Sequence, residues 1–216
     1  MKIIIHRGTH QIGGSAVEIS TKTTRIILDM GDELGLEKYY MPCPLVIDGV
    51  TEGTSNCDGV LISHYHGDHL GQLKAVLSDI PIYVGTLSKA IALIPSEHKD
   101  SQLYLRLLGA NTFSGGNVFT IGDIRIRPLV IDHSAADMFV IEAEGKRILY
   151  TGDFRLHGLR LHCIEKLIKN YVGTIDILIT EGTTLSRNQG RTISEAEVLD
   201  DITSYVSDGK YVFVMC

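Results

Sequence analysis

Residues 63–71 read Ser-His-Tyr-His-Gly-Asp-His-Leu-Gly, and this is the most informative segment of the chain. Three imidazoles (His64, His66 and His69) and the carboxylate of Asp68 lie within six residues of one another. The segment follows an apolar run typical of a buried strand and precedes a helical pattern. Zinc takes imidazole nitrogens and carboxylate oxygens as ligands. The spacing therefore predicts a metal site where a strand ends.

The geometry of a strand end predicts the directions in which these four side chains point. Because side chains alternate along a strand, His64 and His66 should point to the same side. The turn that follows should present Asp68 and His69 from a second direction. Two such half-sites can hold two metal ions side by side, and a catalytic zinc site keeps one position open for water.

Short apolar, β-branched runs separated by turns predict a chain that is rich in strands. The predicted strands are 2–6, 16–20, 24–29, 59–63, 80–84, 124–130, 138–143, 147–151, 175–180 and 211–215, with a hairpin turn at Glu144-Gly145. The predicted helices are 70–77, 87–94 and 101–108, the last two separated near Pro95, and a helix to about Val206 that follows a capping box at Thr192 and Glu195.

Composition and charge limit the classes of function. The chain has 216 residues, of which 44% are hydrophobic and 21% charged, so we expect one or two globular domains. A net charge of −6 excludes a surface that is basic all over, but residues 145–170 carry six basic residues against two acids. The four scattered cysteines form no metal or redox motif. The N-terminal apolar run is too short for a signal peptide and no stretch approaches the roughly 20 apolar residues of a membrane span, so we expect a cytoplasmic protein.

The segment His-x-His-x-Asp-His resembles the signature of the metallo-β-lactamase superfamily. Three further segments resemble motifs of that family in the same order: Ile26-Ile-Leu-Asp-Met-Gly31, Val130-Ile-Asp-His-Ser134 and Tyr150-Thr-Gly-Asp-Phe-Arg155. The resemblance implies an α/β fold, an αββα sandwich of two mixed sheets flanked by helices. His133 and Asp153 each follow an apolar run, which independently places them at strand ends.

The resemblance also implies the roles of the site residues. One metal would take His64, His66 and His133, the other would take Asp68 and His69, and Asp153 would bridge them. Asp29 would support the site from behind. The cofactor is expected to be one or two Zn²⁺ ions, with Mn²⁺ or iron able to use the same donors. A hydroxide activated by the metals would attack, with Asp68 and Asp153 as the catalytic carboxylates.

The end of the chain resembles a particular branch of that family. Residues 177–184, Ile-Leu-Ile-Thr-Glu-Gly-Thr-Thr, look like the first motif of the β-CASP nucleases, the group that includes ribonuclease J-like enzymes. This implies a metallo-β-lactamase domain over residues 1–180 and the start of a β-CASP-like α/β domain over 181–216. The chain is then expected to be the front part of a longer protein. Gly182 stands where the group more often has serine.

Three hypotheses for function remain open from the sequence. The favoured one is a phosphodiesterase that cleaves single-stranded RNA, in preference to DNA, with Glu181, Arg155 and His157 as candidate contacts to the substrate. The second is a small-molecule hydrolase of the thioesterase or lactonase kind, similar to glyoxalase II. The third is a non-catalytic module that binds nucleic acid or a partner. A homo-oligomer is compatible with each of them.

Overall fold

The first of two sheets is mixed and contains the strand that leads into the histidine segment. In the computed structural model, which describes residues 1–34, 43–185, 190 and 192–213, its six strands follow the order of the chain. These are β1 (Lys2–Arg7), β2 (Ala16–Ser20), β3 (Arg25–Leu28), β4 (Gly59–Ile62), β5 (Ile82–Gly85) and β6 (Asn111–Phe113). β1, β2 and β3 are antiparallel, and β3 to β6 are parallel.

The second sheet has five strands in the order β11-β10-β9-β8-β7. They are β7 (Phe119–Ile121), β8 (Ile124–Val130), β9 (Asp137–Ala143), β10 (Lys146–Tyr150) and β11 (Ile177–Ile179), antiparallel except for the pair β10 and β11. The predicted hairpin is confirmed: Glu144 and Gly145 join β9 to β10 with φ values of 47° and 73°. Two positive φ values are what a tight two-residue turn requires.

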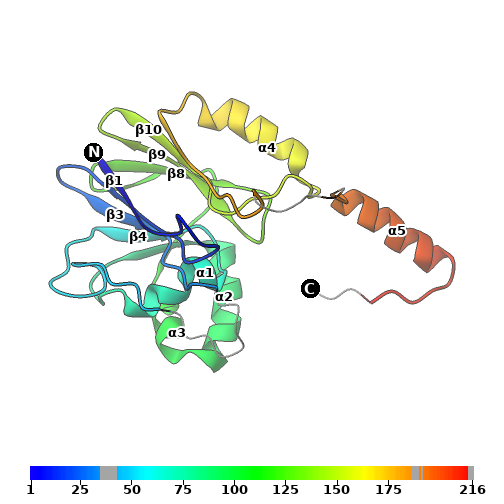
Figure 1. The fold of residues 1–216 in the computed structure, drawn as a ribbon, viewed down its shortest axis with the longest axis horizontal. Helices are drawn as coiled ribbons and strands as arrows, with labels where there is room; N and C mark the ends of the chain where they lie inside the picture. Colours follow the sequence, from blue (N-terminus) through cyan, green and yellow to red (C-terminus); the bar gives the residue numbers. More distant parts are fainter. Residues whose placement is uncertain (35–42, 186–189, 191, 214–216) are drawn as a thin grey trace.

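Helices cover the outer faces of the two sheets (Figure 1). The first sheet is covered by α1 (Gly67–Leu70), a 3₁₀ turn (Gly71–Ala75), α2 (Thr86–Lys99) and α3 (Ser101–Leu108). The second sheet is covered by α4 (Leu161–Leu167), which continues into a π-helical turn (Ile168–Val172). Helix α5 (Glu195–Ser207) projects away from both sheets and has no buried residue. The predicted αββα sandwich is confirmed.

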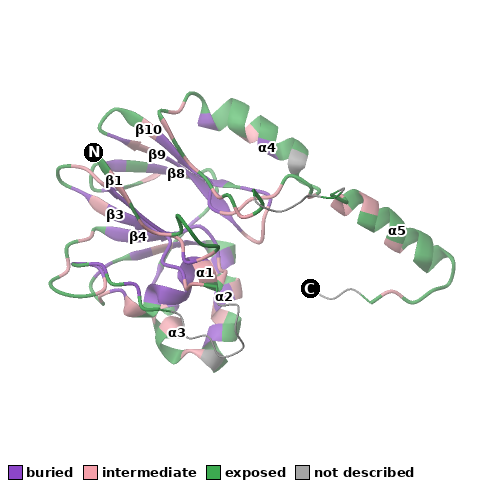
Figure 2. Ribbon diagram, in the orientation of Figure 1, coloured by how far each residue is buried: buried purple, intermediate pink, exposed green. Residues whose placement is uncertain are grey.

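The hydrophobic core has three layers, one between the two sheets and one between each sheet and its helices. The middle layer packs Leu28 and Leu61 of the first sheet against Phe139 and Ile148 of the second. A second cluster lies between the first sheet and α2 and α3, and a third lies between the second sheet and α4. The buried residues of Figure 2 accordingly concentrate in the strands and on the inner sides of the helices. Since β3, β4 and β9 are buried on both faces, their sequences are almost continuously apolar.

Several predicted elements are wrong in detail. Helix α2 runs through Pro95, and Ala92 and Ser96 on either side of it are buried; the break comes at Asp100, which caps α3. The helix predicted over 70–77 begins at Gly67 and turns 3₁₀ at Gly71. The strands β6 and β7 and the helix α4 were not predicted.

The end of the chain also differs from expectation. The capping box of α5 is formed by Ser194 and Glu197 rather than by Thr192 and Glu195. The strand predicted over 211–215 is absent from residues 211–213, and its remainder lies outside the described residues. Within the part of the chain that the structure describes, no helix is both long and apolar enough to cross a membrane.

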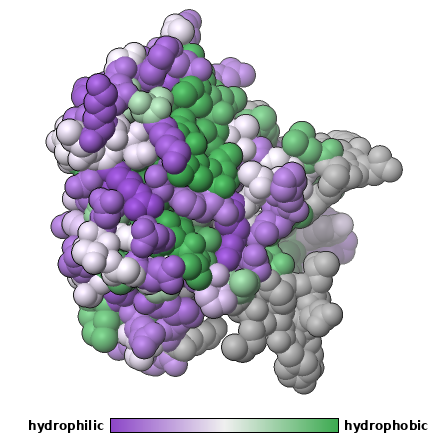
Figure 3. All heavy atoms as spheres, turned by 60° about the vertical axis from the view of Figure 1, so that its left-hand side comes forward, coloured by the Kyte–Doolittle hydropathy of each residue, from purple (hydrophilic) through white to green (hydrophobic). Residues whose placement is uncertain are grey.

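Both sheets leave an apolar edge strand uncovered. Ile5 of β1 is 47% exposed and Leu178 of β11 is 54% exposed. Ile5 and Ile179 line a common cleft, so the two edges lie near each other. A band of hydrophobic residues also crosses an otherwise largely hydrophilic face in Figure 3. The open edges therefore form one side of the cleft described below.

One buried carboxyl group gives a prediction about stability. Asp137 lies at the start of β9, is 6% exposed, and its Oδ1 has no hydrogen-bond partner among the described residues. Burial raises the pKa of Asp137 from 3.8 to about 6. The folded chain therefore holds a proton that the unfolded chain loses, and stability falls as the pH rises from about 4 to 6.

Asp137→Asn is expected to stabilise the protein at pH 7.5 by about 1 to 3 kcal/mol, since about two pKa units correspond to about 3 kcal/mol. The gain should shrink as the pH is lowered towards 4, where the native carboxyl is neutral as well. Urea unfolding of both proteins across this pH range measures it, with the exposed Asp208→Asn as control. A variant less stable than wild type at pH 7.5 would contradict the inference that the surroundings of Asp137 favour the neutral carboxyl group.

Candidate metal centre

The histidine segment lies where strands of both sheets end. β4 is buried along its whole length and ends at Ile62, so the residues that follow it emerge at the edge of the sandwich. His64 is fully buried, and α1 then begins at Gly67. β8 ends at Val130 and β10 at Tyr150, which brings the loops with His133 and Asp153 to the same place.

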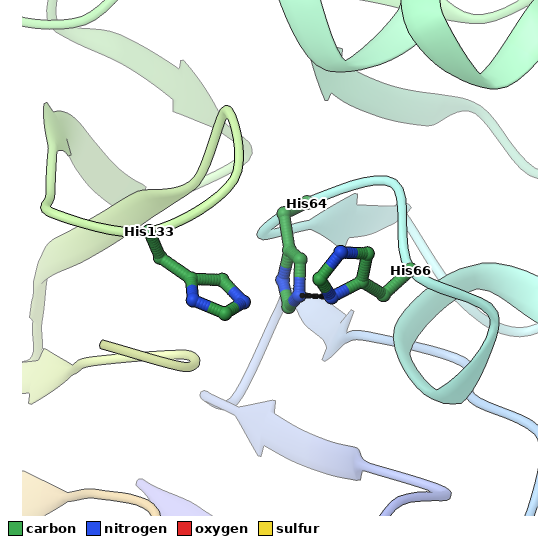
Figure 4. A group of neighbouring side chains, drawn as sticks. All are labelled: His64, His66 and His133. Carbon is green, nitrogen blue, oxygen red and sulfur yellow. Dashed lines mark hydrogen bonds between the residues drawn. The ribbon is translucent and has the colours of Figure 1, made fainter. Parts of the chain in front are cut away.

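Three histidines form the first cluster (Figure 4). The distance from His64 Nε2 to His66 Nδ1 is 3.0 Å, and one ring nitrogen from each of His64, His66 and His133 lies within 4.8 Å of the others. In Figure 4 the imidazole of His133 points towards the other two from the opposite loop. His133 Nε2 is buried without a hydrogen-bond partner among the described residues. A buried nitrogen left unpaired in this way calls for an explanation, and a bound cation supplies one.

A second cluster shares His64 with the first. Ligand atoms of His64, His69 and Asp153 also lie within 4.8 Å of one another. His69 Nε2 is 3.1 Å from one oxygen of Asp153 and 3.9 Å from Asp68 Oδ2. The other oxygen of Asp153 is 4.0 Å from His64 Nε2 and 3.9 Å from His133 Nε2. Asp153 thus belongs to the second cluster and also lies within 4.0 Å of two histidines of the first; its bridging role stays a prediction.

Asp29 lies behind the second cluster and is completely buried. Its Oδ2 accepts hydrogen bonds from Ser63 Oγ at 2.8 Å and from the Tyr150 hydroxyl at 2.6 Å, and it lies 2.8 Å from His69 Nδ1. Its Oδ1 accepts from the amide of Ser63 at 2.7 Å. With Nδ1 held by Asp29, His69 offers Nε2 to the cleft. No sequence pattern pointed to the hydrogen bond between Tyr150 and Asp29.

Burial and neighbouring charges shift the pKa values of three residues of the site. Burial and the neighbouring charge of His69 lower the pKa of His64 to about 2, so His64 is neutral and keeps a free lone pair. Burial pulls the pKa of His69 down, but the carboxylates of Asp29 and Asp153 outweigh it and raise that pKa to about 10. The pKa of Asp153 is lowered: burial raises it, and the hydrogen bond and charge of His69 more than offset this. The two carboxylates therefore favour a positive charge at His69, which is a proton when no metal is bound and which a metal ion at Nε2 would replace.

These residues fit one or two divalent metal ions. Neutral imidazoles and ionised carboxylates are the forms that bind zinc. The first cluster supplies three nitrogens, and the second supplies an imidazole with one or two carboxylates. The same donors suit manganese or iron, so the donor set does not select the metal. The assignment of each residue to a particular ion stays a prediction.

A cleft of about 830 Å³ opens beside the second cluster. Asp68, His69 and Asp153 line one part of it, and the loop 8–13 and residues 179–183 line much of the rest. The loop after β1 is fixed to the site, because the amide of Ser15 donates to the carbonyl of Asp68 at 3.0 Å. A cleft of this size is within the range of small-molecule and cofactor sites.

The three predicted substrate contacts lie in different surroundings. Glu181 lines the cleft, where its Oε1 accepts from the amide of Phe154 at 2.9 Å. Arg155 is turned towards other carboxylates, and His157 is exposed with its carbonyl bonded to the amide of Glu195 at 2.9 Å. Of the three, Glu181 is the one that lines the described part of this cleft.

Comparisons with known proteins identify the family of this chain. Residues 13–200 match the model of the metallo-β-lactamase superfamily. The chain is 27% identical to "Probable RNase MJ4" of Methanocaldococcus jannaschii, over 85% of this chain and 45% of that protein. It is 30% identical to "Endoribonuclease ysh1" of Emericella nidulans, over 96% of this chain and 26% of that protein. The chain thus spans less than half the length of these relatives.

A solved structure supports the fold. The crystal structure of a protein of unknown function from Enterococcus faecalis V583 superposes with a TM-score of 0.80 at 20% identity, covering 95% of this chain and 57% of that one. At this identity the likeness concerns the fold alone. The match over residues 13–200 shows the family, and the shared fold agrees with it. The chain belongs to the metallo-β-lactamase superfamily.

Proposed function

We propose that this chain carries the metal centre of a zinc-dependent ribonuclease that hydrolyses phosphodiester bonds in single-stranded RNA. The observation that carries the proposal is the convergence of three imidazoles from two loops, with one nitrogen of each within 4.8 Å of the others. The names of the relatives, an RNase and an endoribonuclease, support RNA as the substrate class. We place the protein in the cytoplasm.

The proposal assigns a role to each ligand. His64, His66 and His133 would hold one zinc ion, Asp68 and His69 would hold a second, and Asp153 would serve both. Bound zinc acts as a Lewis acid and lowers the pKa of a coordinated water to about 7. Asp68, which is 3.9 Å from His69 Nε2, is placed to orient the attacking water and to accept its proton. Asp29 keeps His69 in the tautomer that leaves Nε2 free.

The surroundings of the site leave room for a substrate beyond the metal ligands. The cleft is open and continues past the metal ligands along the loop 8–13 and residues 179–183. Glu181 is held by the amide of Phe154, one residue from Asp153, and can contact the substrate beside the bridging carboxylate. We further propose that residues 181–216 begin a β-CASP-like unit, since Glu181 and the hydroxyl residues after it follow the strand β11.

Hydrolysis of labelled single-stranded RNA tests the proposal. The zinc-loaded protein is expected to release labelled products, and a His66→Ala, Asp68→Ala double variant should lose more than about a hundredfold in rate, because one ligand from each cluster is gone. The same proteins are assayed against single-stranded DNA, a thioester and a lactone. Equal RNA hydrolysis by wild type and variant would refute the mechanism. Hydrolysis of the thioester or lactone without RNA cleavage would favour the small-molecule alternative.

A further inference from the structure

Arg155 joins two loops that carry proposed metal ligands. It comes two residues after Asp153, and its amide donates to the carbonyl of Asp132 at 3.0 Å. Its Nε donates to Oδ1 of the Asp132 carboxylate at 3.3 Å. Asp132 immediately precedes His133, so one side chain holds together the loops after β8 and β10.

The carboxylate of Asp132 depends on this arginine. Asp132 is 4% exposed, and its Oδ2 has no hydrogen-bond partner among the described residues. Gly158 packs against it so closely that a Cβ there would lie 2.1 Å from Oδ2. A buried carboxylate needs a partner, and the guanidinium of Arg155 is the cation that contacts Asp132, the residue next to the proposed ligand His133.

The same guanidinium reaches helix α5. Arg155 Nη2 lies 2.6 Å from Glu195 Oε1, and the other oxygen of Glu195 accepts from the amide of Leu159 at 3.0 Å. Glu195 is the first residue of α5, a helix with no buried residue of its own. These polar contacts therefore tie the start of α5 to the loop that carries Asp153.

We propose that Arg155 is a positioning residue: it fixes the spacing of His133 and Asp153 and couples that spacing to the start of helix α5. This inference rests on the proposed metal centre. It differs from the sequence-based expectation that Arg155 contacts the substrate, since Nε and Nη2 are already engaged by two carboxylates. A guanidinium serves two carboxylates through its planar fork, and the ammonium of lysine does not.

Zinc affinity separates a positioning residue from a substrate contact. Zinc binding to the chain is measured by competition with a chelator, for wild type, Arg155→Gln and Arg155→Lys. Both variants are expected to bind zinc about tenfold more weakly, as loss of a group that orients ligands usually does. RNA binding is then followed against salt concentration, and the slope should be unchanged. Lys166→Gln, which removes an exposed charge from α4, is the matched control and should bind zinc as wild type does.

Other outcomes overturn the inference in distinguishable ways. Normal zinc affinity in Arg155→Gln would refute the positioning role. Rescue of function by Arg155→Lys, together with a salt slope of RNA binding that falls by about one in Arg155→Gln, would make Arg155 a phosphate contact instead. Wild type that binds no zinc would refute the metal centre itself. If Arg155→Gln does not fold, the Asp132→Asn, Arg155→Gln pair removes the buried charge, and its zinc affinity decides the question. Glu195→Gln, which cuts the link to α5 alone, should give an intermediate loss; no loss would refute the coupling to α5.

Discussion

Asp153→Asn is expected to lower RNA hydrolysis by more than about a hundredfold while leaving the fold intact. Asparagine has nearly the volume of aspartate, and Asp153 is only partly buried, so packing is preserved. The carboxylate, however, lies 3.1 Å from His69 Nε2 and within 4.0 Å of both His64 and His133. Replacing groups that merely orient a ligand costs about 10- to 100-fold, so replacing the group between two clusters should cost more.

The measurement combines rate with metal content. Wild type and Asp153→Asn are loaded with zinc, dialysed, and compared for bound zinc per chain, RNA hydrolysis and thermal unfolding. The variant should retain less zinc, because the second cluster loses its closest carboxylate. Asp201→Asn, on the exposed helix α5, is the control for the loss of one negative charge. A variant that keeps both its zinc and its rate would remove Asp153 from the site.

The ligands could be predicted from the sequence because strand ends bring distant residues together. His64, His133 and Asp153 come shortly after the strands β4, β8 and β10, and the three strands end at the same edge of the sandwich. An apolar run followed by a polar residue with a metal-binding side chain is visible in the sequence. The spatial order of the strands was supplied by the resemblance to a family, since periodicity alone does not fix topology.

The groups behind the ligands could not be predicted in the same way. Tyr150 is an ordinary aromatic residue at the end of an apolar strand, and its hydroxyl bond to Asp29 depends on the packing of one sheet on the other. The contact of Arg155 with Asp132 and Glu195 likewise joins residues 23 and 40 positions apart in the chain (132, 155 and 195). Such pairs carry no local pattern, so only the folded chain identifies them.

Local signals also failed where packing outweighed them. Pro95 predicted a helix end, yet α2 continues through it, with Ala92 and Ser96 buried around it and Ser96 Oγ donating to the carbonyl of Ala92 at 2.8 Å. Asp29 carries backbone strain, because its φ of 60° is an uncommon value for a residue other than glycine. Four hydrogen-bond contacts to its carboxylate hold it in this conformation. Strain of this kind next to a site is compatible with a role in placing His69.

Gly31→Ala is expected to destabilise the protein by about 3 kcal/mol or more and to weaken zinc binding at the same time. A Cβ at Gly31 would lie 1.6 Å from the carbonyl oxygen of Asp68 and 2.9 Å from the amide nitrogen of His69. Both are backbone atoms, so no side-chain rotation relieves the clash. Overpacking a rigid site costs about 1 to 3 kcal/mol or more, and here the atoms displaced belong to two proposed ligands.

The reason that Gly31 lies so close is that backbone hydrogen bonds hold the two segments together. The amide of Met30 donates to the carbonyl of His69 at 2.7 Å, and the amide of Asp32 donates to the carbonyl of Gly67 at 2.9 Å. The segment after β3 therefore sets the position of the turn with Asp68 and His69. A displacement of about 1 Å in such a turn can cost about a hundredfold in rate, so the loss of activity should exceed what the loss of stability alone produces.

Gly67→Ala is the matched control, because it adds the same methyl group to the same turn. A Cβ at Gly67 would meet nothing within 4 Å, and alanine is favoured over glycine in the first turn of α1. Its stability and zinc affinity should equal or slightly exceed those of wild type. Urea unfolding and chelator competition on both variants measure the contrast. Equal behaviour of Gly31→Ala and Gly67→Ala would mean that the turn with Asp68 and His69 is not positioned by the segment after β3, and that its place is set by the ligands themselves.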